Sequence, residues 1–152
     1  MRTQRGFALV ELIVVMLIIG ILLGLTSINL ARSQQTASLT SAGETLIADL
    51  RQQQLKSMIG DTEGRSDSAS YGIHFDSNRY VLFHGTYSDG INSNFVVNLD
   101  SNIQFNNPHP DIIFSKLSGE ITGNTIIELQ DNTNSNLKRI HLNTLGTVMQ
   151  VE

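Results

Sequence analysis

The sequence predicts an α+β protein in which a long N-terminal α-helix, hydrophobic in its first half, packs on a C-terminal antiparallel β domain built as one sheet or as two small ones. Two observations lead to this fold class. Apolar residues crowd into the first 30 of the 152 positions, in a run long enough for an extended helix. From Tyr71 onward, short β-prone runs alternate with turn-forming Asn, Asp, Ser and Gly.

The composition narrows the classes of function. The chain is 40% hydrophobic and 16% charged, carries a formal net charge of −4 at pH 7 and contains no cysteine. A negative net charge supplies no global field that would hold nucleic acid or anionic lipid. The absence of cysteine excludes disulfides and thiol chemistry, and it fits an exported protein without demanding one.

The first predicted element is an apolar helix over residues 7–30. This run of 24 residues contains one charge, Glu11, and as a helix it would span roughly 36 Å, enough for the core of a membrane. Arg2 and Arg5 precede it, so the positive-inside tendency keeps the N-terminus in the cytoplasm. A secretory signal peptide is the alternative, but its apolar region would be shorter and would end in a small-residue cleavage site, which residues 25–30 do not resemble.

A single carboxylate interrupts this apolar run. On insertion scales such a group costs on the order of 2.5 kcal/mol or more, so it normally has a partner. No Lys or Arg lies within two helical turns of Glu11 on its C-terminal side. Two interpretations are open: an acid that happens to lie near the membrane surface, and a functional group that a second chain neutralises.

The residues around Glu11 resemble the prepilin cleavage and methylation motif of type IV pilins and type II secretion pseudopilins. In that motif a short basic leader ends in glycine, an aromatic residue follows, and glutamate comes four positions later. The matching residues here are Gly6-Phe7-Ala8-Leu9-Val10-Glu11-Leu12. The resemblance implies a pilin-like fold, cleavage by a prepilin peptidase between Gly6 and Phe7, and N-methylation of Phe7. It also implies that Glu11 pairs with the new terminal amine of a neighbouring subunit and sets the register of assembly.

The second half of the predicted helix has a different character. Polar residues dominate, and the apolar ones recur at spacings of three, four and five: Leu39, Ala42, Leu46, Leu50, Leu55, Met58 and Ile59. This stripe predicts an amphipathic continuation that Gly60-Asp61 ends. The expected organisation is therefore a leader (1–6), a transmembrane or filament-core helix (7–30), an amphipathic continuation (31–59), a linker loop (60–70) and a β-rich globular head (71–152).

The head reads as a series of short strands. Residues 71–75 and 79–83 flank Asp76-Ser77-Asn78 and predict a hairpin, and further strands are expected at 95–99, 103–105, 112–115, 125–129, 137–142 and 147–151. The hairpin, with segments around residues 113–119, 126–129 and 139–148, resembles the GspH/FimT group of minor pseudopilins. That group often has arginine after the last glycine, where this chain has Thr147.

The sequence contains no constellation typical of catalysis. Its four histidines do not pair at metal-ligand spacing, no nucleophile elbow occurs, and the carboxylates are scattered singly. We therefore expect no enzyme, no cofactor and no metal. Two oxygen-rich loops, residues 89–94 and 131–136, could hold calcium, although Asx turns explain both more simply.

The leading hypothesis is a structural subunit, a minor pseudopilin or minor pilin of a type II secretion pseudopilus or type IV pilus. Its partners would be other pilin or pseudopilin subunits, the prepilin peptidase, the inner membrane and the assembly platform. The chain would cross the inner membrane once, with a cytoplasmic N-terminus and a periplasmic or extracellular head, before it joins the filament.

A DNA-binding minor pilin of a DNA-uptake pilus is the alternative hypothesis. FimT-like members of the group that the head resembles take part in DNA uptake. Lys138 and Arg139 are the only adjacent basic pair in the head, so they would make the contact. Two charges supply little electrostatic binding, and Thr147 in place of arginine weakens this alternative further.

Overall fold

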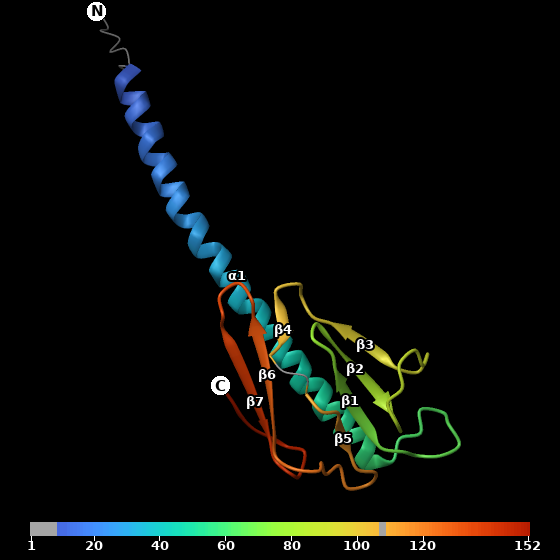
Figure 1. Cartoon of the computed structure of the whole chain (residues 1–152). Coiled ribbons are helices and arrows are strands. Elements are labelled where there is room, and N and C mark those ends of the chain that lie inside the picture. The colour runs from blue at the N-terminus through green and yellow to red at the C-terminus, as the bar shows by residue number, and fades with distance from the viewer. Residues whose placement is uncertain (1–8, 107–108) are drawn as a thin grey trace, which may run out of the picture. The chain divides into compact units, whose positions relative to one another are not determined.

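The structure is a computed structural model that describes residues 9–106 and 109–152, with residues 25–35 described by their backbone alone. It divides into two units, Met1–Gln35 and Thr36–Glu152, and we call the second unit the head. The helix α1 (Leu9–Ile59) contributes to both units. The described strands all lie in the head (Figure 1): β1 (Tyr71–Phe75), β2 (Arg79–His84), β3 (Phe95–Asn98), β4 (Ile103–Phe105), β5 (Ile112–Phe114), β6 (Thr125–Asp131), β7 (Leu137–Leu142) and β8 (Val148–Val151).

The strands form two antiparallel sheets of four. The first has the order β3-β2-β1-β5 and the second the order β4-β6-β7-β8. One helix followed by two antiparallel sheets confirms the α+β prediction, in its version with two small sheets. Phe7, where the predicted helix begins, lies outside the described residues.

The end of α1 follows the sequence prediction closely. Gly60 adopts a positive φ of 65°, which glycine tolerates without steric cost. Its N–H donates to the Ser57 carbonyl at 3.2 Å, and the Asp61 N–H donates to the Lys56 carbonyl at 3.0 Å. This pair of bonds is the Schellman pattern that satisfies the last carbonyls of a helix. The described residues 60–70 that follow contain no helix or strand.

The hairpin predicted at Asp76-Ser77-Asn78 is confirmed. β1 and β2 pair antiparallel on either side of it, and Gly72 lies opposite Phe83. A Cβ added at Gly72 would lie 2.4 Å from Cζ of Phe83 and 2.8 Å from the carbonyl oxygen of Ile112. The Phe83 ring therefore covers the place where a side chain at position 72 would stand, so this strand position requires glycine.

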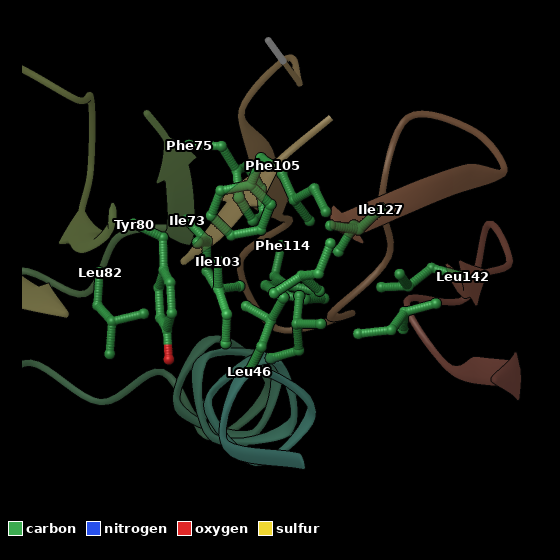
Figure 2. Close-up of a cluster of buried hydrophobic side chains, with 14 of the residues drawn as sticks. Leu46, Ile73, Phe75, Tyr80, Leu82, Ile103, Phe105, Phe114, Ile127 and Leu142 are labelled. Carbon is green, nitrogen blue, oxygen red and sulfur yellow. The ribbon is translucent and has the colours of Figure 1, made fainter. Parts of the chain in front are cut away.

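Both sheets share one hydrophobic core with α1. Leu39, Leu46 and Leu50 come from the helix, and the other buried members of the cluster come from the sheets: Ile73, Phe75, Tyr80, Leu82, Ile112 and Phe114 from the first, and Ile103, Phe105, Ile127, Leu129, Ile140 and Leu142 from the second. Figure 2 draws most of these side chains as sticks, and they lie between the helix and the strands. The head therefore has one core rather than one for each sheet.

The predicted apolar stripe of the helix is confirmed in part. Its members Leu39, Leu46 and Leu50 are buried, with at most 5% of each side chain exposed. It is wrong in the last turns, where three predicted members are exposed: Leu55, Met58 and Ile59.

Polar residues occupy the buried face of these last turns instead. Gln53 is 3% exposed and Ser57 is fully buried. The Ser57 hydroxyl contacts the carbonyls of Phe114 at 2.7 Å and Ser115 at 2.9 Å, which makes its burial tolerable. Residues 53 and 57 follow residue 50 on the same face of the helix at spacings of three and four, whatever their polarity. The prediction selected apolar residues, so it chose positions off this face in the last turns.

Candidate assembly site

The first described turns of α1 present an apolar surface that is exposed to solvent. Every residue from 9 to 24 is exposed, and the large apolar side chains range from 45% exposed at Ile19 to 74% at Leu9. Residues 12–19 are all apolar, and at about 100° per residue they face every direction around the helix. Helices that are apolar all round are normally buried in protein or membrane, so we call residues 9–24 the assembly segment.

Nowhere in the described part of the chain is a helix both long enough and apolar enough to cross a membrane.

Glu11 lies in the first described turn of the assembly segment, where it is exposed. Its helical neighbours one turn further on, Val14 and Val15, are apolar. The next basic residue toward the C-terminus is Arg32, which at 21 residues is roughly 32 Å further along a helix. An ion pair for Glu11 on that side must therefore come from another chain.

Gly6 and Phe7 lie outside the described residues. The predicted cleavage between them and the methylation of Phe7 therefore stay predictions.

The two residues expected to contact DNA point in different directions. Along β7, Lys138 shares a face with the buried Ile140, and Arg139 lies on the opposite, outer face. A Cβ added at Gly43 of α1 would lie 2.7 Å from Cδ of Lys138, so the stem of this lysine passes over the helix. The structure does not bring the two cations to one surface.

Arg139 also has a carboxylate partner on the outer face. Its Nε donates to Oε1 of Glu128 at 2.7 Å, across the directly paired strands β6 and β7. This bond is the largest cause that lowers the pKa of Glu128 below its ordinary value, and Asn106 adds a second hydrogen bond. Both groups are therefore ionised at neutral pH, and the charge of Arg139 is locally compensated.

Asp131, in the second oxygen-rich loop, is fully buried and closes the turn between β6 and β7. Its Oδ1 accepts the Thr133 N–H at 2.8 Å, the geometry of an Asx turn. The hydrogen bond from the Thr133 N–H is also the largest cause that lowers the pKa of Asp131 below its ordinary value. Donors already surround the carboxylate that would be the first ligand of a calcium ion. Across the described residues, no cluster of three or more His, Asp or Glu is arranged to hold a metal.

Two features of the head were missed by sequence reasoning because their members come from distant segments. His74 on β1 lies 2.6 Å from Asp111 through Nδ1 and stacks on Tyr87, with the ring centroids 3.8 Å apart. A cavity of about 330 Å³ lies between α1 and the first sheet, and its lining includes Gln53 and His84. No spacing in the sequence signals either feature.

The comparison with protein families bears on the N-terminus. Residues 1–27 match the model described as the prokaryotic N-terminal methylation motif, which is the type IV pilin-like prepilin signal. The motif indicates a type IV pilin-like protein that a prepilin peptidase processes and that assembles with other pilin subunits. The match ends before the head begins at Thr36. No curated protein and no solved structure matches the chain.

Proposed function

We propose that the chain is a structural subunit, a minor pseudopilin or minor pilin that joins a type II secretion pseudopilus or type IV pilus after cleavage of its leader. The observation that carries this proposal is the methylation motif over residues 1–27. The role is mechanical: the chain has no catalytic task and acts through its contacts with other subunits. The resemblance of the head to the GspH/FimT group supports the choice of a minor subunit.

The assembly segment supplies the attraction between subunits. The run 7–30 is held in the inner membrane as a single span before assembly, with the N-terminus in the cytoplasm and the head outside. In the filament, the exposed apolar side chains of one subunit are covered by those of its neighbours. Because lipid tails are as apolar as these side chains, the attraction comes from van der Waals packing between the helices rather than from the hydrophobic effect, and it has no preferred register.

Glu11 supplies the register that apolar contacts lack. A carboxylate buried without a partner in a low-dielectric filament core is strongly unfavourable. The N-methylated ammonium of Phe7 in an adjoining subunit relieves this cost only when the two helices stack at the correct height. The charge pair therefore selects one arrangement among many that bury the same apolar area.

Processing is tested by expressing the full chain with and without a prepilin peptidase. Mass spectrometry should show loss of residues 1–6 and one added methyl group on Phe7 only when the peptidase is present. Gly6→Lys should block the cleavage, because the motif requires glycine before the cut. An N-terminus that stays intact beside an active peptidase would reject the proposal.

The register role is tested separately with Glu11→Gln, which keeps the size of the side chain and removes its charge. We expect cleavage to proceed and the amount of subunit recovered in sheared filaments to fall at least about tenfold, because the specific pairing is lost. Glu44→Gln is the matched control, because it makes the same change at an exposed position of the same helix. Equal incorporation of both variants would remove the register role while leaving the processing result intact.

A further inference from the structure

Met149 of β8 lies outside the regular strand pairing of the second sheet. In the register of β7 and β8, His141 pairs with Gln150 and Leu142 pairs with Val148, so Met149 has no paired residue on β7. This arrangement is a β-bulge, in which one strand carries an extra residue and the local direction of its side chains changes. Because β8 is also an edge strand of its sheet, the bulge leaves this methionine free of the ladder.

Met149 is an apolar residue that is 68% exposed. Met58, the other methionine of the head, is 47% exposed and packs beside a backbone segment. A Cβ added at Gly119 would lie 2.6 Å from Cγ and 3.0 Å from Sδ of Met58. In the head, Met149 is therefore the methionine that a small molecule in the surrounding water reaches more easily.

An amide from the turn before β8 faces the sulfur atom of Met149. Nδ2 of Asn143 lies 3.3 Å from Sδ of Met149, and a thioether is only a weak acceptor. The orientation of the amide is fixed, because its Oδ1 accepts the Thr147 N–H at 3.0 Å. The Asn143 N–H in turn donates to the Thr147 carbonyl at 3.1 Å. Asn143 therefore presents an N–H donor to the sulfur from a turn that is held on both sides.

A thioether in this position can be oxidised by a peroxide to a sulfoxide. A lone pair of the sulfur attacks one oxygen of hydrogen peroxide, the S–O bond forms, the O–O bond breaks, and the second oxygen leaves as water. The sulfur loses two electrons and the peroxide gains them. The N–H of Asn143 engages one of the two lone pairs of the sulfur, so the other stays open to the oxidant.

We propose that Met149 is a peroxide-sensitive modification site of the head and that Asn143 holds the sulfoxide formed there. A sulfoxide oxygen is a stronger acceptor than a thioether sulfur, so the donor already aimed at this side chain gains a better partner. The added oxygen meets water and an amide rather than a core. Oxidation therefore turns an exposed apolar side chain into a polar one without unfolding the head, and methionine sulfoxide reductases can reverse it. This inference goes beyond the structural role and holds whether or not the leader is cut.

The first test measures where oxygen is added. The full chain in detergent micelles is treated with hydrogen peroxide, and peptide mapping by mass spectrometry follows the added oxygen at each methionine. We expect Met149 to react at least about twofold faster than Met58 in the folded chain, because exposure governs access of the oxidant. In the urea-unfolded chain the two should react at about the same rate. Equal rates in the folded chain would overturn Met149 as the preferred site.

The second test measures capture by Asn143 in the isotope-labelled chain with Met58→Leu, which confines oxidation in the head to Met149. The side-chain amide resonances of Asn143 should move downfield when peroxide is added, because a hydrogen bond to a stronger acceptor deshields the proton. Further exchange of Met149→Leu should abolish this movement. Resonances that stay in place while mass spectrometry shows Met149 oxidised, or that still move in Met149→Leu, would overturn the capture.

A third measurement compares stability before and after oxidation in the same Met58→Leu background. Asn143→Asp keeps an oxygen for the Thr147 N–H and replaces the donor beside the sulfur with an acceptor. Oxidation should leave the urea midpoint unchanged or raise it when Asn143 is present, and should lower it in Asn143→Asp. Asn92→Asp, the same change at an exposed loop position, is the matched control and should respond as the parent does. The same change of midpoint with Asn143 and with Asp at this position would overturn the capture.

Discussion

Single residues in the head take their roles from contacts that the chain makes far from them in sequence. Asp131 shows this most clearly, because it is a fully buried carboxylate at the end of a strand whose other buried members, Ile127 and Leu129, are apolar. It is tolerated there because the Thr133 N–H and the Asn134 side chain donate to it, at 2.8 and 3.3 Å. Its hydrogen bonds replace those it would make to water.

Asp131→Asn should therefore destabilise the head in a pH-dependent way. Because the pKa of Asp131 is lowered in the folded state, its contribution to stability is present above the unfolded pKa of about 3.9 and is lost as the pH falls through the folded value. We expect the variant to have a lower urea midpoint than the wild type at pH 7. The difference should narrow as the pH falls below about 4, because the unfolded chain then takes up a proton at this carboxyl group before the folded protein does.

The control for this measurement is Glu120→Gln, which removes a carboxylate from an exposed loop position. It should leave the urea midpoint at pH 7 nearly unchanged. A gap between Asp131→Asn and the wild type that stays constant from pH 7 to pH 3 would show that charge is not the cause.

At the scale of elements, Gly72 and Gly43 each lie close to a neighbouring segment, but the two neighbours differ in rigidity. In β1, a side chain at Gly72 would meet the Ile112 carbonyl oxygen, which belongs to the backbone of a paired strand. In α1, a side chain at Gly43 would meet only the far carbons of the Lys138 stem, the nearest at 2.7 Å. The first neighbour is fixed by the sheet, while the second can swing away.

Gly72→Ala and Gly43→Ala should therefore change the free energy of unfolding differently. Gly72→Ala should lower the free energy of unfolding by about 1–3 kcal/mol, because the sheet must shift to admit the methyl group. For Gly43→Ala we expect a change near zero or a small gain, because the helical preference of alanine over glycine, about 1 kcal/mol, offsets the displacement of Lys138. Urea unfolding of both variants in the same detergent checks the pair, and an equal loss in both would refute the distinction.

The elements themselves were largely accessible from the sequence, and the exceptions have physical reasons. The end of α1 was predicted because Gly60 supplies a left-handed residue, and the first hairpin because alternating apolar residues flank a polar turn. The prediction failed in the last turns of α1, where Gln53 and Ser57 are buried. Ser57 is buried against the carbonyls of Phe114 and Ser115, and Gln53 lines a cavity whose other wall is the first sheet. The sequence does not show where these strands lie relative to the helix.

The candidate site divides in the same way. Glu11 could be singled out from sequence because a charge inside an apolar run is visible locally. The pocket at Gln53 and His84 could not, because these residues lie 31 positions apart and meet only when β2 packs on α1. The separation of Lys138 from Arg139 follows from strand geometry, and a strand prediction alone could have indicated it.

For the whole molecule, the shared core predicts that the two sheets of the head unfold together. Leu46 is fully buried in a cluster that joins α1 to residues of both sheets. If the helix face is what joins the sheets, neither sheet can retain its full stability once that face is damaged. The alternative is that each sheet unfolds on its own, with α1 as a passive neighbour.

Leu46→Ala distinguishes these two cases. Removal of a fully buried leucine side chain should lower the free energy of unfolding by about 2–5 kcal/mol, through lost burial and the cavity left behind. In urea unfolding of the full chain in detergent, amide resonances of β1 and of β6 should lose their native positions at the same midpoint, shifted equally from the wild type. Leu55→Ala, on the same helix but 57% exposed, should change the free energy by no more than about 0.5 kcal/mol. A shift confined to one sheet would mean that the head holds two independently folding halves, and that the stripe on α1 stabilises only the half that moves.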